Sequence, residues 1–210
     1  GTVKRIALQS INTARKSGIR ALGLDEGDEL ISVDVTDGAQ DVMLLTHDGM
    51  GIRFHESDVR CMGRDAVGVR GIKLKDGDYL VGGEIVQPDK LLFSVTENGY
   101  GKRTSPDEFS AQNRGGQGVK AYQCTAKTGN VAAVAMVGEN EDLMMISDDG
   151  TIIRTGAGGV SVISRATQGV KVMTVAEGVK VIGLAVADPA EEEPSDESEA
   201  GESVEQNEAE

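Results

Sequence analysis

A repeat of about 50 residues organises most of this sequence. Three Asp-Gly or Asn-Gly dipeptides each join two short apolar runs, and their glycines, Gly49, Gly99 and Gly150, stand 50 and 51 positions apart. Asp-Gly and Asn-Gly favour the positive φ angles of a type I′ turn, so each dipeptide predicts a β-hairpin. A second series of glycines keeps the same spacing, and each member opens another short apolar run: Gly18, Gly68, Gly118 and Gly169.

Each repeat also carries a strand-like segment before its hairpin. The segments ELISVDV, YLVGGEIV and VAAVAMV precede the three hairpins, and KVIGLAV begins a fourth copy. A repeat therefore contains one strand, a hairpin pair, a glycine-bearing loop and a fourth strand. Four strands in about 50 residues are typical of a propeller blade and not of a βαβ unit or a solenoid. The sequence predicts an all-β, propeller-like fold of four-stranded blades.

The repeat also sets the expected division of the chain. The sequence opens in the third strand of a repeat, because GTVKRI matches GMGIRF, so we expect a fold that is incomplete at its N-terminus and part of a longer protein. Closed propellers usually need at least four blades. We predict the C-terminal half of a truncated blade at 1–27, blades at 28–76, 77–128 and 129–178, a last strand at 179–187 and an acidic tail at 188–210.

Charge is distributed unevenly along the chain. The formal net charge is −14, but residues 188–210 hold 11 of the 35 acidic residues and no basic one. That tail is poor in hydrophobic residues and repels itself, so it is predicted to be disordered. The remaining residues carry 24 acidic and 21 basic side chains, which leaves them close to neutral. The positions of the basic residues therefore matter more than their sum.

Basic residues recur with the repeat in three series. One series lies in the strand after each hairpin turn, one lies two residues after each loop glycine, and one lies four residues before it. In a radial repeat, equivalent positions come out at equivalent places around the rim, so these cations are expected to form a curved stripe. The members are Arg5, Arg53, Arg103 and Arg154, with Lys102 beside Arg103; Arg20, Arg70, Lys120 and Lys171; and Arg64, Arg114 and Arg165, with Arg15 and Lys16 in the shorter first copy.

A curved basic stripe is suited to duplex DNA. DNA carries a negative charge about every 1.7 Å of its axis, and a protein that neutralises phosphates releases counterions. Contacts to the backbone along a curved surface bend DNA without reading bases. The alternative is structural: the strand arginines would pair with neighbouring acids, and the periodic glycines would only turn corners. Arg70 also shares its alternation with Ile72 and Leu74, which should face a core.

The stretch QNRGGQG, residues 112–118, is the most unusual copy of the loop. Its glycines lack the Cβ that would keep backbone N–H groups away from a phosphate, so the loop could form an anion-binding nest. Arg114 is expected to bond phosphate oxygens, Gly115, Gly116 and Gly118 to allow the close approach, and Gln112, Asn113 and Gln117 to donate neutral hydrogen bonds.

The sequence shows no catalytic constellation. The three tyrosines match no cleavage motif, no Walker A loop occurs, and the two cysteines, Cys61 and Cys124, have no ligand spacing with the two histidines. We therefore expect no catalytic residue, no metal and no cofactor in this chain. No run approaches eighteen consecutive apolar residues, so no membrane span is expected.

The runs VMLLTHDGMGIRFHESDVRCMGRDAVGVRGIKL, TENGYGKRTSPDEF and DLMMISDDGTIIRT resemble the C-terminal region of the gyrase A polypeptide of bacterial DNA gyrase, a type IIA topoisomerase, from Gly1 to about Asp188. The resemblance implies a β-pinwheel, a propeller-like disc in which blades exchange strands and whose rim wraps DNA. It implies double-stranded DNA as a partner, with the remainder of gyrase A and the gyrase B polypeptide in a heterotetramer. It also implies ATP-dependent supercoiling in the bacterial cytoplasm, with ATP and magnesium used elsewhere in the holoenzyme.

The signature loop of that family reads Gln-Arg-Arg-Gly-Gly-Lys-Gly. Here Gln112, Arg114 and the three glycines match it, while Asn113 and Gln117 replace two cations. The family layout places the full loop in the first blade, so this copy is expected to be a degenerate later one that contributes to wrapping. Two other interpretations stay open: the equivalent domain of topoisomerase IV, and a propeller scaffold for protein partners. The acidic tail is expected to compete with DNA for the basic rim.

Overall fold

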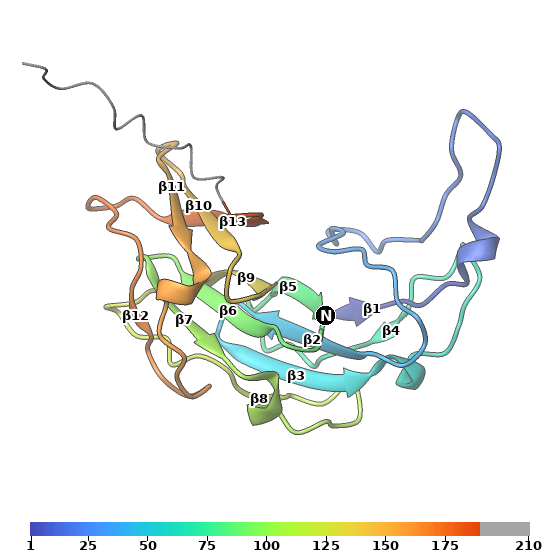
Figure 1. The fold of residues 1–210 in the computed structure, drawn as a ribbon. Helices are drawn as coiled ribbons and strands as arrows, with labels where there is room; N and C mark the ends of the chain where they lie inside the picture. Colours follow the sequence, from blue (N-terminus) through green and yellow to red (C-terminus); the bar gives the residue numbers. More distant parts are fainter. Residues whose placement is uncertain (190–210) are drawn as a thin grey trace, which may run out of the picture.

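The computed structural model describes residues 1–189, and these fold into antiparallel sheets joined by loops, whose only helical elements are short 3-10 turns. The all-β prediction is confirmed. The sheets follow one another along an arc, from β1 and β4 at one end to β10, β11 and β13 at the other (Figure 1). The strands are β1 (Thr2–Val3), β2 (Asp41–Thr46), β3 (Met50–His55), β4 (Val69–Arg70), β5 (Leu80–Ile85), β6 (Leu91–Thr96), β7 (Tyr100–Thr104), β8 (Val119–Lys120), β9 (Val131–Val137), β10 (Asp142–Ser147), β11 (Ile152–Gly156), β12 (Val170–Lys171) and β13 (Val181–Ala187).

The three predicted hairpins are present as β2–β3, β6–β7 and β10–β11. Their turn differs from the expected type I′, which needs a positive φ at two successive residues. Gly49 has φ 79°, but among residues 1–189 the one non-glycine residue with a positive φ is Asp89, so Asp48 is not left-handed. β2 ends at Thr46 and β3 begins at Met50, so three residues form the loop, and its last residue, Gly49, is left-handed. This is the arrangement of a type I turn followed by a glycine bulge.

Each sheet takes strands from two consecutive repeats. The order is β5-β2-β3-β8 in one sheet and β9-β6-β7-β12 in the next, so a hairpin is flanked by strands that come later in the chain. The predicted boundaries at 76/77 and 128/129 lie between strands, but each sheet combines strands from both sides of one of them. Strand exchange of this kind is the β-pinwheel arrangement. Because β5 packs against β9 and β9 against β13, these strands form the inner edges. The opposite, outer edge is formed by β8 and β12, together with β4, which pairs with β1 as β8 pairs with β3.

The loop glycines allow the outermost strands to dock. Gly118 has φ +70°, and a Cβ at this position would lie 2.3 Å from the carbonyl oxygen of Gly51 on β3. Gly169 has φ +74°, and a Cβ there would lie 2.7 Å from the carbonyl oxygen of Gly101 on β7. A side chain at either position would push β8 or β12 away from the hairpin that it joins. Gly118 and Gly169 of the second series therefore serve strand exchange, whereas a Cβ at Gly18 would meet nothing within 4 Å, and Gly18 opens no strand.

Hydrophobic clusters fill the space between consecutive sheets. Met43 and Leu45 of β2 pack with Leu92 of β6 and with residues of β9, whereas Leu44 belongs to the cluster on the other face of the same strand. Successive side chains of a strand point to opposite faces, so each central strand contributes to two clusters. The arc is held by interfaces between neighbouring sheets.

Two parts of the sequence prediction need separate comment. The segment ELISVDV forms no strand, and its apolar residues are exposed: Leu30, Ile31, Val33 and Val35. Its counterparts β5, β9 and β13 each pair with the first strand of the preceding hairpin, and residues 1–28 provide no such strand to pair with it. The predicted disorder of the acidic tail falls outside the described residues, except at Asp188 and Pro189. No helix within residues 1–189 is long and apolar enough to cross a membrane.

Candidate nucleic-acid interface

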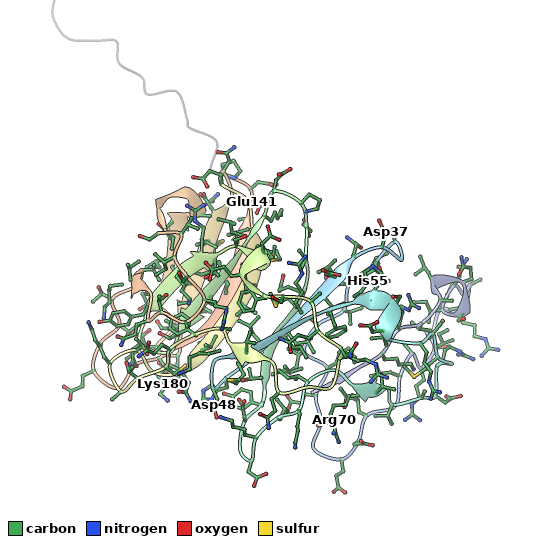
Figure 2. The ribbon with its side chains drawn as sticks, turned by 90° about the horizontal axis from the view of Figure 1, so that it is seen from below. Asp37, Asp48, His55, Arg70, Glu141 and Lys180 are labelled. Carbon is green, nitrogen blue, oxygen red and sulfur yellow. The ribbon has the colours of Figure 1, made fainter. Side chains whose placement is uncertain are left out.

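The outer edge carries one basic residue on each of its short strands. Arg70 lies on β4, Lys120 on β8 and Lys171 on β12, and all three side chains are exposed. The strand ends at Arg70, and the next two residues, Gly71 and Ile72, are both buried. The alternation of buried and exposed residues is therefore broken here, and Arg70 does not face the core with Ile72. The two-residue strand thus leaves Arg70 facing solvent (Figure 2).

Loop arginines lie against these edge residues. Arg114 Nη1 donates to the carbonyl oxygen of Arg70 at 3.0 Å, and its Nε donates to the carbonyl oxygen of Asp58 at 2.8 Å. In the next repeat, Arg165 Nη1 donates to the carbonyl oxygen of Lys120 at 2.7 Å. Both arginines remain partly exposed. The fold therefore brings two of the three predicted basic series together. At each contact, an arginine four residues before a loop glycine lies against a basic residue that follows the loop glycine of the preceding repeat.

The first repeat shows a related juxtaposition. Lys4 Nζ donates to the carbonyl oxygens of Ala21 and Arg64 at 2.9 and 2.7 Å. These bonds hold the segment that follows Arg20 beside the loop that contains Arg64. Arg20 Nε donates to the carbonyl oxygen of Leu22 at 3.2 Å. The side chains of this end of the edge are exposed: Arg15, Lys16, Arg20 and Arg64.

The arginines after the hairpin turns take a different place. Arg103 is 4% exposed; its Nε donates to the carbonyl oxygen of Val160 at 2.8 Å, and its Nη2 to that of Gly158 at 3.0 Å. Its Nη1 pairs with Glu139 at 2.5 Å. The expectation that Arg103 lies on the outer edge is wrong, because the side chain is enclosed between its own sheet and the 3-10 turn of the next repeat, Ala157–Gly159.

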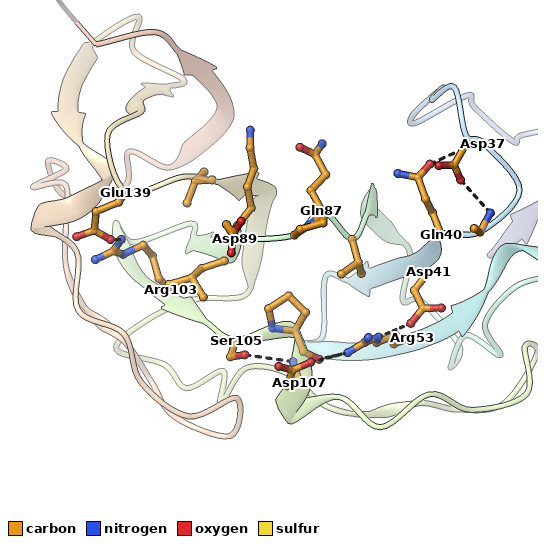
Figure 3. Close-up of a pocket in the computed structure, with 17 residues that line it drawn as sticks. Asp37, Gln40, Asp41, Arg53, Gln87, Asp89, Arg103, Ser105, Asp107 and Glu139 are labelled. Atoms are coloured by element: carbon orange, nitrogen blue, oxygen red, sulfur yellow. Dashed lines mark hydrogen bonds and ion pairs between the residues drawn. The ribbon is translucent and has the colours of Figure 1, made fainter.

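The other three arginines of this series also have partners within the protein. Arg53 Nε donates to Asp41 Oδ2 at 2.7 Å, and its Nη1 reaches the carbonyl oxygen of Pro106 at 2.8 Å, again in the 3-10 turn of the next repeat (Figure 3). Arg5 pairs with Glu56 of the turn Glu56–Asp58 at 3.5 Å. Arg154 pairs with Asp142 at 2.7 Å. These contacts agree with the structural alternative, in which the strand arginines pair with neighbouring acids.

The cleft around Arg53 and Arg103 does not suit DNA. It has a volume of about 820 Å3, and its walls hold the carboxylates of Asp37, Asp41, Asp89, Asp107 and Glu139 together with three basic side chains. Five carboxylates would repel a phosphate backbone more than three cations, each already paired with a carboxylate, could attract it. In Figure 2, Asp37 lies on the side of the molecule opposite Arg70. The acidic cleft and the basic edge are therefore separate surfaces.

Lys102, which lies beside Arg103 on β7, is also not on the edge. The residue is 1% exposed, and its Nζ donates to the carbonyl oxygens of Ala121 at 3.0 Å and Ser164 at 2.9 Å, and also to that of Arg165. The ammonium lies 4.7 Å from the centre of the Tyr122 ring. Burial lowers the pKa of Lys102 to about 8. The prediction of a surface position for Lys102 is wrong, because backbone carbonyls surround its charge.

The loop at 112–118 uses part of its backbone internally. The amide of Gly115 donates to the carbonyl oxygen of Gly71 at 2.6 Å, and the carbonyl oxygen of Gly116 accepts from the amide of Lys73 at 2.8 Å. The amide of Gln112 donates to the carbonyl oxygen of Arg53 at 2.8 Å. The expected nest therefore does not have the Gly115 amide available. Asn113 and Gln117 are exposed, and Gln112 and Arg114 are partly exposed, so all four polar side chains of this loop reach solvent.

Lys127 is a basic residue of this surface that the periodic pattern missed. Its Nζ lies 5.2 Å from the centre of the Tyr100 ring, and Lys171 Nζ lies 4.9 Å from the same ring. Both lysines line a cleft of about 320 Å3. The positions equivalent to Lys127, four residues before β5 and β13, hold Asp76 and Glu177. A search for repeated cations could not find it.

Comparisons with known proteins agree with this architecture. The model of a family described as "DNA gyrase C-terminal domain, beta-propeller" matches residues 1–37, 40–87, 90–137 and 141–188. The chain is 44% identical over 197 residues to the gyrase A polypeptide of Salmonella typhimurium and 54% identical over 189 residues to that of Streptococcus pyogenes. These alignments cover 93% and 90% of this chain but 22% and 23% of the relatives. The chain thus spans about a fifth of the length of the curated relatives.

Solved structures give the same result. A "C-terminal domain of DNA topoisomerase IV" superimposes with a TM-score of 0.83 at 26% identity, covering 90% of this chain and 59% of that one. A "DNA gyrase A C-terminal domain" superimposes with a TM-score of 0.75 at 29% identity, covering 82% of this chain and 59% of that one. The four matched repeats and the sequence identities show that the chain belongs to the family of DNA gyrase A C-terminal domains.

Proposed function

We propose that this domain binds duplex DNA along its outer edge and bends it, through contacts to phosphates and without reading bases. One observation carries the proposal: an arginine of each of two consecutive loops lies on the backbone of the basic edge residue of the preceding repeat, Arg114 at Arg70 and Arg165 at Lys120. The exposed ends of these side chains are therefore grouped on one edge of the arc. Grouped cations at regular intervals match a polymer with regularly spaced phosphates.

The contacts within each group leave charge available to DNA. Arg70, Lys120 and Lys171 are exposed, and none of these side chains is among the ion pairs found within residues 1–189. Arg114 and Arg165 use backbone carbonyls as acceptors, which orient each guanidinium without neutralising it. Of the arginines that pair with carboxylates, Arg5, Arg53 and Arg103 connect neighbouring repeats. Phosphate binding and assembly of the arc thus use different basic residues.

Within a longer polypeptide, this binding would support the wrapping of DNA and the ATP-dependent introduction of negative supercoils. The relatives that the chain matches are named as gyrase A polypeptides, and the chain corresponds to about a fifth of each. The remainder of gyrase A and a gyrase B polypeptide would supply DNA cleavage, ATP and magnesium, in the bacterial cytoplasm. The loop at 112–118 would contribute Arg114 to the wrap as a degenerate copy of the family's signature loop.

Topoisomerase IV is the second candidate for the parent enzyme. The superposition on a topoisomerase IV domain has the higher TM-score, 0.83 against 0.75. The sequence comparison favours gyrase, because several gyrase A polypeptides are 40% to 54% identical to this chain. The DNA-binding edge that we propose is the same for either parent.

A titration with duplex DNA at several salt concentrations tests the proposal. Binding through phosphates predicts that log Kd changes linearly with log salt, with a slope of roughly 0.9 for each phosphate neutralised. Duplexes of unrelated sequence should give similar affinities. A protein scaffold with no DNA function predicts weak binding with little dependence on salt, and that result would refute the proposal. Ligation of a nicked plasmid with the bound protein then shows whether the duplex is wrapped, because wrapping changes the linking number of the product.

A further inference from the structure

The same two carbonyl positions accept hydrogen bonds from a buried or half-buried lysine in two of the repeats. Lys102 Nζ donates to the carbonyl oxygens of Ala121 and Arg165, and Lys4 Nζ donates to those of Ala21 and Arg64. The positions are equivalent, since Ala21 and Ala121 follow the basic residue after the loop glycine, and Arg64 and Arg165 precede such a glycine by four residues. Each lysine therefore joins a loop to the outer strand of the repeat before it.

The repeat between them satisfies the equivalent carbonyl oxygen without a lysine. Ile52 occupies the position equivalent to Lys102, and it is fully buried. The carbonyl that corresponds to that of Ala121 belongs to Gly71, and it accepts from the amide of Gly115 at 2.6 Å. Gly115 has φ +84°, a conformation that L side chains rarely adopt, and this turns its amide toward Gly71. The residue equivalent to Gly115 beside Lys102 is Ala166.

The two arrangements are therefore alternatives. A loop with glycine at this position supplies its own amide, and isoleucine fills the space beneath it. A loop with alanine keeps its amide elsewhere, and lysine provides the missing donor. A buried carbonyl left without a donor costs free energy, so one of the two donors is required. The additional bonds from Lys102 Nζ to Ser164 and Thr167 hold the loop at several points along its backbone.

We propose that Lys102 is a positioning residue of the DNA-binding edge, which holds the loop at residues 164–168 so that Arg165 stays beside Lys120. The proposal rests on the proposed function in so far as Arg165 contacts phosphate. Lys102 itself touches no DNA, since it is enclosed by the protein. Replacing it releases the loop, and the guanidinium of Arg165 then samples many positions and contributes less to binding. Lys4 has the same positioning role at the loop that contains Arg64.

The decisive comparison converts one of the two arrangements found in this chain, lysine with alanine, into the other, isoleucine with glycine. Lys102→Ile installs the residue found at position 52 and should weaken binding to duplex DNA, at most to the level of Arg165→Ala. Lys102→Ile combined with Ala166→Gly recreates the glycine arrangement and should recover most of the affinity. In the Arg165→Ala background, Lys102→Ile should add little, because both changes remove the same contact. Additive effects of Lys102→Ile and Arg165→Ala, or no recovery with Ala166→Gly, would overturn the proposal.

A measurement without DNA separates this proposal from the proposed function. The amide of Gln123 donates to the carbonyl oxygen of Thr167 at 3.0 Å, so its hydrogen exchange reports whether the loop stays in place. Lys102→Ile should speed this exchange severalfold relative to Gln112, whose amide bonds Arg53 in another repeat, and the double variant with Ala166→Gly should restore it. Unchanged exchange at Gln123 refutes the positioning role. Faster exchange together with an Arg165→Ala variant of full DNA affinity refutes the phosphate contact instead. Should Lys102→Ile fail to fold, Lys102→Met, which keeps an unbranched side chain, takes its place in each comparison.

Discussion

Arg114 donates a hydrogen bond from Nη1 to the backbone carbonyl oxygen of Arg70 at 3.0 Å, although the two residues are 44 positions apart. The contact joins a loop of one repeat to the outermost strand of the repeat before it. It fixes where the Arg114 guanidinium lies, and no carboxylate within residues 1–189 forms an ion pair with it. The same relationship between Arg165 and Lys120 in the next repeat makes the arrangement a property of the repeat.

Arg114→Ala is therefore expected to weaken binding to all duplex sequences alike. The loss of one phosphate contact should reduce the slope of log Kd against log salt by about one. Fluorescence anisotropy with two unrelated duplexes at several salt concentrations measures both quantities. Arg154→Ala is a matched control, because it also removes one arginine but one that pairs with Asp142. If both variants lose affinity equally, net charge and not position determines binding.

Arg103→Ala is expected to act on stability. The side chain is buried and serves two backbone carbonyls, those of Gly158 and Val160, which would lose their donor. Leaving buried acceptors unsatisfied should lower the free energy of unfolding by about 2–4 kcal/mol. The half-exposed pair of Arg154 and Asp142 provides the comparison, and its loss should cost less than about 1 kcal/mol. Urea denaturation of the two variants distinguishes them, and equal midpoints would contradict the structural role of Arg103.

Periodicity predicted the hairpins, the four-stranded sheets and the basic positions that recur, because each depends on short stretches of sequence. It did not show that β8 joins β3 of another repeat, since such pairing depends on contacts between distant residues. Equivalent positions in the repeat also do not show which way a side chain points. Basic residues recur at the positions of both Arg103 and Lys120, but Arg103 is buried and Lys120 is exposed. Lys127 was missed for the opposite reason, because acidic residues occupy its place in the other repeats.

Gly118→Ala should be the most damaging of three glycine substitutions. Its φ is +70°, and the new Cβ would lie 2.3 Å from the Gly51 carbonyl oxygen, so both backbone strain and a clash oppose it. At Gly150 only the positive φ of 85° applies, since nothing lies within 4 Å. Gly63 has open space and no positive φ. We expect losses in unfolding free energy of at least about 2 kcal/mol at Gly118, about 1 kcal/mol at Gly150 and close to none at Gly63. Thermal or urea denaturation gives the order, and a mild effect at Gly118 would contradict the docking role of this glycine.

The pH dependence of stability should carry the signature of Lys102. Its pKa is about 8 in the folded protein, lowered by burial from the ordinary value of 10.5. Between these values the unfolded chain binds more protons than the folded one, so the contribution of Lys102 to the free energy of unfolding rises with pH, by up to about 1.4 kcal/mol per pH unit. The Lys102→Ile variant lacks this contribution. The difference in unfolding free energy between the native chain and the variant should therefore shift in favour of the native chain from about pH 8 to 9.5. Tyr122 lies against the ammonium, but burial raises the pKa of its phenol, which therefore stays neutral in the folded protein over this window. Parallel curves for the two proteins over this window would show that the Lys102 ammonium keeps an ordinary pKa in spite of its burial.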